Sequence, residues 1–93
     1  MDDDPVPVPL EDAFDLHSFH PRDVPSAVGE YLDEARAIFP EVRLIHGRGV
    51  GVQREIVRGL LARRADVADF FDAPPERGGW GATVVVFGPT PGR

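Results

Sequence analysis

The chain of 93 residues contains no cysteine. Without thiols it has no disulfide framework and no thiolate zinc site, so its stability has to come from packing, and nothing indicates an oxidising compartment. Long apolar runs are also missing, and none approaches the roughly 18 residues that cross a bilayer. The chain begins Met1-Asp2-Asp3-Asp4, which is acidic where a signal peptide would be basic. We therefore expect a cytoplasmic protein that does not enter a membrane.

Lysine is absent as well, and all ten basic residues are arginines. The formal net charge of -6 argues against a nucleic-acid partner, but the charges are unevenly distributed, because the acids dominate the first fifteen residues. Six of the arginines lie between the second predicted strand and the end of the second predicted helix: Arg43, Arg48, Arg54, Arg58, Arg63 and Arg64. This concentration favours a local basic surface for an anionic polymer. Arg63 and Arg64 are expected only to solvate a helix face.

At this length the chain is expected to form one small domain, which we predict to be a monomer. Residues 1–12 are acidic and contain Pro5, Pro7 and Pro9, and this alternation of proline with valine suits an extended, polyproline-like arm. The domain itself is predicted over residues 13–88. The last residues, 89–93, are expected to fray.

Hydrophobic periodicity and turn residues divide the domain into six elements. Strands are predicted at 13–17, 42–46, 67–73 and 82–87, helices at 24–39 and 53–64, and a turn at 74–80. The first helix has apolar residues at i, i+3, i+4 and i+7 spacing, including Tyr31 and Ile38, with Asp23 as its N-cap and Pro40 as its end. The nearly unbroken apolar run at 82–87 predicts the central strand.

The resulting order, β-α-β-α-β-β, predicts an α/β fold of the two-layer α+β sandwich type. Two strand-helix crossovers imply a parallel first pair of strands in a four-stranded mixed sheet, with both helices on one face. Ligands of such sheets bind beyond the C-terminal ends of the parallel strands. On the second helix, Arg54 and Arg58 are one turn apart and are expected to share a solvent-exposed face.

A glycine-rich loop, HGRGVG at residues 46–51, follows the second predicted strand. Its glycines allow a tight turn and close approach to a ligand, and the first amides of the following helix favour an anion such as phosphate. The loop lacks the Lys and Ser or Thr of a Walker loop, and its glycine spacing does not match the dinucleotide fingerprint. The alternative is a tight turn whose glycines only satisfy backbone geometry.

A second polar group ends the first predicted strand, where Asp15 and His17 point to the same side because strand side chains alternate. Since the first two strands are predicted to be parallel, this pair and His46 should meet at one edge of the sheet. Each residue also has a simpler interpretation. Asp15 alone is more often the cap of the following turn, and either histidine can be a half-buried ring bonded to a carbonyl.

Three segments together resemble the small MutS-related (Smr) domain family: DLH at 15–17, HGRG at 46–49 and GGWGATVVVF at 78–87. The resemblance covers about residues 13 to 88. It implies a fold similar to the C-terminal domain of bacterial translation initiation factor three, and a domain that binds nucleic acid or cuts it as an endonuclease. The sequence departs from the family's LDLHG pattern at Phe14 and at Ser18, where a leucine and a glycine are usual.

Phosphodiester cleavage needs a general base, a general acid and positive charge near the phosphate. His17 and His46 can serve as base and acid, and Asp15 can orient one imidazole. On RNA the neighbouring 2'-hydroxyl can act as nucleophile, so no cofactor is required, although a divalent metal, Mg²⁺ or Mn²⁺, is compatible with the site. A metal site formed by these three side chains is the less favoured alternative.

The predicted phosphate- and substrate-binding residues come from the glycine loop, the second helix and the third family segment. They are Gly47, Arg48, Gly49, Gly51, Arg54, Arg58, Gly79, Trp80 and Gly81. Trp80 is interpreted either as a lid on the core, which we favour, or as an exposed platform on which a base stacks. His20 is expected to be a loop residue.

Two other functions compete with an endonuclease. A non-catalytic module that binds DNA, RNA or a nucleoprotein through Arg48, Arg54 and Arg58 is favoured by the acidic arm and by Ser18. Such a module would bind in a salt-dependent manner without turnover. A protein-interaction domain that uses the proline-rich arm is the third hypothesis.

Overall fold

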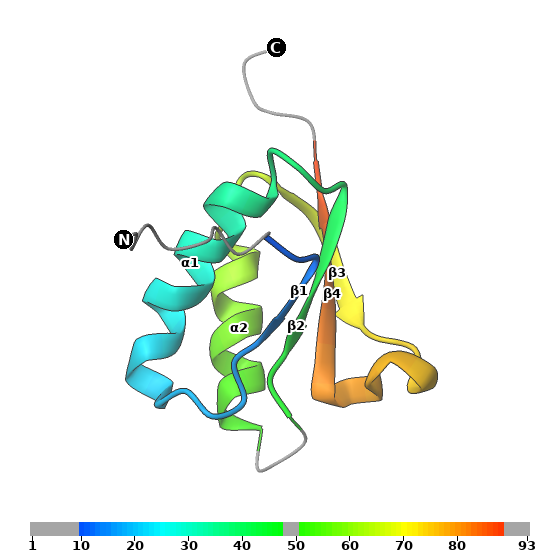
Figure 1. Cartoon of the computed structure of the whole chain (residues 1–93). Coiled ribbons are helices and arrows are strands. Elements are labelled where there is room, and N and C mark those ends of the chain that lie inside the picture. The colour runs from blue at the N-terminus through cyan, green and yellow to red at the C-terminus, as the bar shows by residue number, and fades with distance from the viewer. Residues whose placement is uncertain (1–9, 48–50, 89–93) are drawn as a thin grey trace, which may run out of the picture.

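The computed structural model describes residues 10–47 and 51–88 and consists of a sheet with two helices against one of its faces (Figure 1). The elements in chain order are β1 (Ala13–Asp15), α1 (Val24–Ala35), β2 (Glu41–Ile45), α2 (Val52–Ala62), β3 (Val67–Asp72) and β4 (Ala82–Phe87). The predicted order and the two-layer α+β class are confirmed. The predicted C-terminal end at 89–93 and most of the predicted arm at 1–12 lie outside the described residues.

The four strands are arranged in the order β1-β2-β4-β3. β1 runs parallel to β2, while β4 is antiparallel to both of its neighbours. The first four residues of β4 are buried, which confirms the prediction of a central strand from its apolar run. Because β1 and β2 are parallel, their C-terminal ends lie at the same edge of the sheet.

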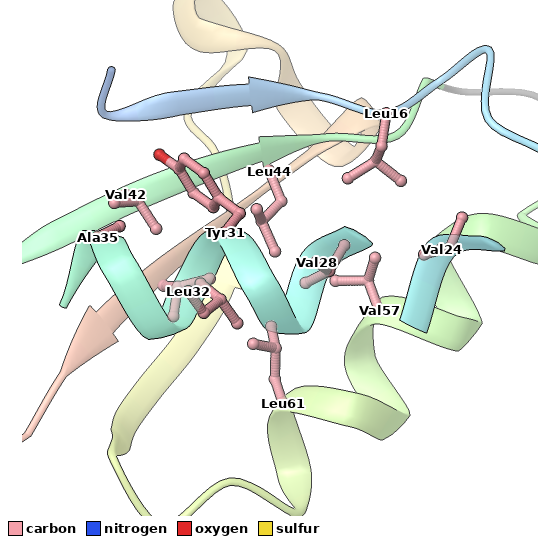
Figure 2. Packing of buried hydrophobic residues seen from close by; sticks show 11 residues of the cluster. Leu16, Val24, Val28, Tyr31, Leu32, Ala35, Val42, Leu44, Val57 and Leu61 are labelled. Carbon is pink, nitrogen blue, oxygen red and sulfur yellow. The ribbon is translucent and has the colours of Figure 1, made fainter. Parts of the chain in front are cut away.

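The main core lies between the sheet and the two helices (Figure 2). Leu16, Leu32, Leu44 and Val85 are fully buried there, and the side chains of α1 point between the sheet and α2. Tyr31 is also part of this core, as its place in the apolar stripe predicted, and its ring stacks on Phe14 at 4.8 Å between centroids. The opposite face carries no helix and only a smaller buried cluster, formed by Ala73, Ala82 and Val84.

The predicted element bounds need several corrections. β1 ends at Asp15 and not at residue 17, because the Asp15 carboxylate accepts a hydrogen bond from the His17 amide and turns the chain. α1 ends at Ala35 and not at residue 39, since the amides of Ala37 and Ile38 bond carbonyls three residues back and form tighter turns before Pro40. Ile38, predicted in the buried stripe, is therefore 61% exposed.

The predicted N-cap of α1 is also wrong. A 3-10 turn, Pro21–Asp23, precedes the helix, so the backbone of Asp23 is already helical and its side chain makes no capping bond. His20 caps this turn instead, through Nδ1, which accepts a hydrogen bond from the amide of Arg22 at 3.2 Å. The loop thus enters α1 without the extended N-cap conformation in which an aspartate side chain bonds helix amides.

The turn predicted at 74–80 consists of two short 3-10 turns, Pro75–Arg77 and Gly79–Gly81. Gly78 joins them with φ +118°, a conformation that side chains disfavour, and a Cβ there would lie 2.9 Å from the Cβ of Ala82. This joint sets Gly79–Gly81 directly before β4.

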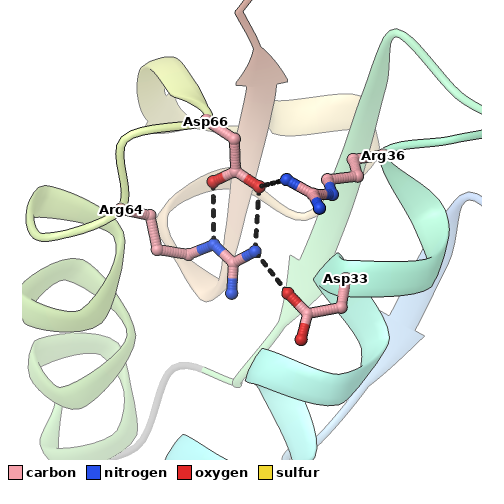
Figure 3. A network of polar contacts seen from close by, with 4 residues as sticks. All are labelled: Asp33, Arg36, Arg64 and Asp66. Atoms are coloured by element: carbon pink, nitrogen blue, oxygen red, sulfur yellow. Dashed lines mark hydrogen bonds and ion pairs between the residues drawn. The ribbon is translucent and has the colours of Figure 1, made fainter. Parts of the chain in front are cut away.

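Arg64 does more than solvate a helix face, contrary to the prediction. Its guanidinium donates two hydrogen bonds to Asp66 and one to Asp33, and Asp66 also accepts a bond from Arg36 (Figure 3). These bonds hold the pKa of the Asp66 carboxyl below its usual value and raise the pKa of Arg64. The cluster connects α1 to the segment that follows α2.

Candidate functional site

A cavity of about 300 Å³ opens where the C-terminal ends of β1 and β2 meet the start of α2. It is lined by His17, Pro21, His46, Gly47, Gly51, Val52, Gln53 and Arg54. The amide of Leu16 bonds the carbonyl of Ile45 at 2.8 Å, which continues the parallel pairing to the cavity. The structure therefore brings His17 and His46 to one cavity, at the sheet edge where the sequence predicted them.

Asp15 and His17 form a close pair at the rim. The ring Nδ1 of His17 lies 2.5 Å from Oδ1 of Asp15, and the same oxygen accepts the His17 amide at 3.0 Å. These hydrogen bonds lower the pKa of the Asp15 carboxyl, so it is charged at neutral pH and fixes the proton of His17 on Nδ1. Asp15 thus caps the turn and orients the imidazole at once. Both side chains are more than half exposed.

His46 lies on the floor of the cavity and is only 4% exposed. Its Nδ1 lies 3.1 Å from the carbonyl oxygen of Gly47, and its Nε2 lies 2.9 Å from Oγ1 of the buried Thr83. Since a carbonyl only accepts, Nδ1 donates and Nε2 of the neutral ring accepts from the threonine hydroxyl. Burial lowers the pKa of His46, which agrees with a neutral ring.

The carbonyl of Gly81 connects the second and third family segments. It accepts hydrogen bonds from the amides of His46 and Gly47, at 3.0 and 2.9 Å. Gly47 has φ +84°, and a Cβ there would stand 3.4 Å from the Cβ of His17. A positive φ favours glycine at this position. All three segments that resemble the family therefore meet around the cavity.

The first turn of α2 supplies the remaining wall. Gly51, with φ +87°, is the N-cap, and its carbonyl accepts the first helical bond, from Glu55. The amides of Val52, Gln53 and Arg54 therefore have no partner within the helix, and they lie at its positive end. The Gln53 side chain donates to the carbonyl of Phe19, which joins the helix to the loop after β1. This wall suits an anion.

Arg54 and Arg58 do share one face of α2, but that face is not solvent-exposed as predicted. Both guanidiniums donate to Oδ1 of Asp72 on β3, at 2.7 and 3.2 Å, and their side chains are 24% and 29% exposed. The bond from Arg54 is the main reason that the pKa of Asp72 is lowered. Arg54 also lies over the ring of Trp80, 5.9 Å from its centroid, and Arg58 lies over Phe70.

The other predicted site residues lie beside the cavity or outside the described part of the chain. Gly79, Trp80 and Gly81 form the 3-10 turn before β4, beside the cavity wall. Trp80 is 43% exposed and belongs to neither buried cluster, so the lid interpretation is wrong. Arg48 and Gly49 lie outside the described residues. Across residues 10–47 and 51–88, no group of three or more His, Asp or Glu side chains is arranged to hold a metal ion.

Sequence reasoning missed three residues that build this site: Gln53, Asp72 and Thr83. Thr83 is the single hydroxyl in an otherwise apolar strand, and that exception was an available signal. Asp72 and Gln53 have no such signal in the sequence, because the residues that they bond lie 18 and 34 positions away along the chain.

Comparison with known proteins gives the same family by sequence and by structure. The sequence matches the Smr domain family over residues 14–88. It is 46% identical to Endonuclease MutS2 of Thermus thermophilus over 63 residues, which are 67% of this chain and 8% of that protein. The crystal structure of the Smr domain of that MutS2 superposes with a TM-score of 0.80 at 39% identity, covering 85% of this chain and 100% of the domain.

A second solved structure is similar over the same share of the chain. YdaL of Escherichia coli, a stand-alone small MutS-related protein, superposes with a TM-score of 0.79 at 26% identity, covering 85% of this chain and 66% of YdaL. The chain spans less than a tenth of the length of the Thermus MutS2 that it matches. No helix in the described ranges combines the length and apolarity that a membrane span requires.

Proposed function

Because the chain belongs to the Smr domain family, we propose that it acts on nucleic acid as an endonuclease, by nicking DNA or cutting single-stranded RNA. The observation that carries the proposal is the cavity, which combines an exposed imidazole–carboxylate pair, a guanidinium and a helix N-terminus. The similar Thermus protein is named an endonuclease, which supports the reaction class. We further propose that it works in the cytoplasm as a monomer.

In this proposal His17 is the general base. Asp15 fixes the proton on Nδ1, which leaves Nε2 as the basic nitrogen, and among the described residues Nε2 has no hydrogen-bond partner. On RNA it would take the proton of the 2'-hydroxyl as that oxygen attacks the phosphorus, and the bond from phosphorus to the 5'-oxygen of the next nucleotide would break. The products would be a 2',3'-cyclic phosphate and a 5'-hydroxyl, whose proton would come from water. Arg54 and the first amides of α2 would hold the phosphate oxygens, and the predicted contacts of Arg48, Gly49 and Arg58 remain part of the proposal.

The geometry favours a positioning role for His46 over proton transfer. Both of its ring nitrogens are engaged, and a ring that is 4% exposed has little access to a leaving oxygen. Through Gly47 and Thr83 it ties the glycine loop to β4. Its role as the general acid stays a prediction.

The proposal is tested by cleavage of labelled single-stranded RNA and of supercoiled plasmid, each with a chelator and with added Mg²⁺ or Mn²⁺. We expect His17→Ala to lower the cleavage rate about 100-fold or more, the usual cost of losing a general base. His20→Asn is the matched control, because it keeps an acceptor for the Arg22 amide and should retain the rate. Equal rates for His17→Ala and the unmodified protein would remove His17 from the reaction.

A non-catalytic binding module remains the second candidate. The burial of His46 favours it, because only one exposed histidine then remains at the cavity for proton transfer. In this case the same assay shows no cleavage under any metal condition, while a labelled strand still binds with an affinity that falls as salt rises.

A further inference from the structure

Trp80 is placed unusually for a tryptophan in so small a domain. It is 43% exposed and stands in the Gly79–Gly81 turn, whose other two residues are glycines and have no side chains. Large aromatic side chains are normally mostly buried, so an exposed one needs a reason. Val52, at 48% exposure, is a second exposed apolar residue, and it lines the cavity. The cavity, where we propose that phosphate binds, thus has an exposed apolar side chain of its own.

Arg54 connects the tryptophan to the cavity. Its side chain lines the cavity and also lies over the indole, with the guanidinium carbon 5.9 Å from the ring centroid. The bond to Asp72 at 2.7 Å fixes the guanidinium in this place. Only the Arg54 side chain would then separate a phosphate held in the cavity from the ring of Trp80. The adjoining nucleotide of a bound strand would lie at that ring.

We infer that Trp80 and Arg54 form a stacking subsite for an unpaired nucleobase next to the phosphate bound in the cavity. This inference rests on the proposed function and specifies its substrate as a strand that is single at this position. Aromatic rings bind bases of single strands through their faces, and arginine adds a cation–π contribution. In a duplex both faces of each base are covered by neighbouring pairs, so the subsite stays empty unless a base leaves the stack.

The intrinsic fluorescence of the protein reports directly on this subsite, because Trp80 is the one tryptophan in the sequence. The full chain is titrated with a short single strand, with a strand of equal length and charge that lacks bases at its central positions, and with the matching duplex. RNA and DNA versions of each distinguish the two sources of the base. We expect quenching and tighter binding with the base-bearing single strands. Equal affinity and equal quenching with the abasic strand would overturn the inference.

Substitutions at Trp80 give a second test, with affinity measured by anisotropy of a labelled strand. Trp80→Leu should weaken binding of the base-bearing strand about tenfold and leave the abasic strand unchanged, whereas Trp80→Phe keeps most of the affinity. Phe71→Leu is the matched control, because Phe71 is 42% exposed but lies on the helix-free face of the sheet. Thermal unfolding of each variant confirms that it is folded.

The experiments distinguish a failure of the proposed function from a failure of the stacking subsite alone. If no strand binds at low salt, the proposed function is wrong and the stacking subsite is wrong with it. If all strands bind in a salt-dependent manner but Trp80→Leu changes none of the affinities, phosphate binding stands and only the subsite is excluded.

Discussion

The ionisable side chains of this molecule differ widely in their exposure to solvent and in their hydrogen-bond partners. At the cavity, His17 is exposed and oriented by one carboxylate, while His46 is buried and kept neutral by its surroundings. In the core, the hydroxyl of Tyr31 donates to the carbonyl of Glu11 at 2.5 Å, so the end of the predicted arm is fixed against α1. Burial, followed by the nearby charges of Asp12 and Glu11, raises the pKa of Tyr31 to about 12.

The raised pKa predicts how Tyr31 responds to alkali. As Tyr31 is the one tyrosine in the chain, the absorbance of tyrosinate should rise with a midpoint of about 12 and not 10. The folded pKa lies above the unfolded value, so the stability linked to the neutral phenol is complete below pH 10 and is lost as the pH rises through 12. Tyr31→Phe should reduce that alkaline loss. A midpoint near 10 in the folded protein would mean that the hydroxyl is open to water.

Between elements, the fold depends on polar connections as well as on the apolar stripes of its helices. The Arg64 cluster, which consists of Asp33, Arg36, Arg64 and Asp66, joins the end of α1 to the turn after α2. Asp66 at its centre is 8% exposed. At the other end of α2, Asp72 joins that helix to β3 through Arg54 and Arg58. The basic stretch predicted from the sequence is therefore partly neutralised by acids from other elements.

Removing the central carboxylate of this cluster should destabilise the domain. Asp66→Asn is expected to cost about 1–3 kcal/mol at pH 7 because two arginines lose a charged acceptor, as urea unfolding can measure. The folded pKa of Asp66 is lowered, so its contribution to stability is present above the ordinary aspartate pKa of 3.8 and is lost as the pH falls through the folded pKa. The variant should accordingly lose less stability on acidification.

Asp33→Asn provides the control for that measurement. Asp33 makes one bond to Arg64 and its side chain is 65% exposed, so its loss should cost well under about 1 kcal/mol. Similar costs for the two variants would contradict a central role for Asp66.

On the scale of the whole molecule, the sheet has one heavily buried face and one lightly buried face. Val85 is fully buried against the helices, whereas its neighbour Val86 is partly buried on the helix-free side. We expect Val85→Ala to lower the free energy of unfolding by about 2 kcal/mol and Val86→Ala by less than half as much. Denaturant unfolding of the pair measures the difference, and equal losses would show that the two faces carry comparable packing.

The sequence predicted most of this architecture because the stripe of α1 and the apolar run of β4 are decided locally. It also placed Asp15, His17 and His46 at one edge, since parallel strands end together. It could not predict that Thr83 bonds His46 or that Asp72 bonds two arginines. Those contacts depend on the register of β4 against β2 and on where α2 lies over β3, which no local pattern encodes.

The cavity is lined by residues from the ends of β1 and β2, the loop after β1 and the start of α2, and Thr83 of β4 holds His46 in place. The residues that form and support it therefore extend from Asp15 to Thr83. A fragment that ends before the Gly79–Gly81 turn lacks the Thr83 hydroxyl and the Gly81 carbonyl that hold His46 and Gly47. During synthesis the site is completed only when the last strand has joined the middle of the sheet.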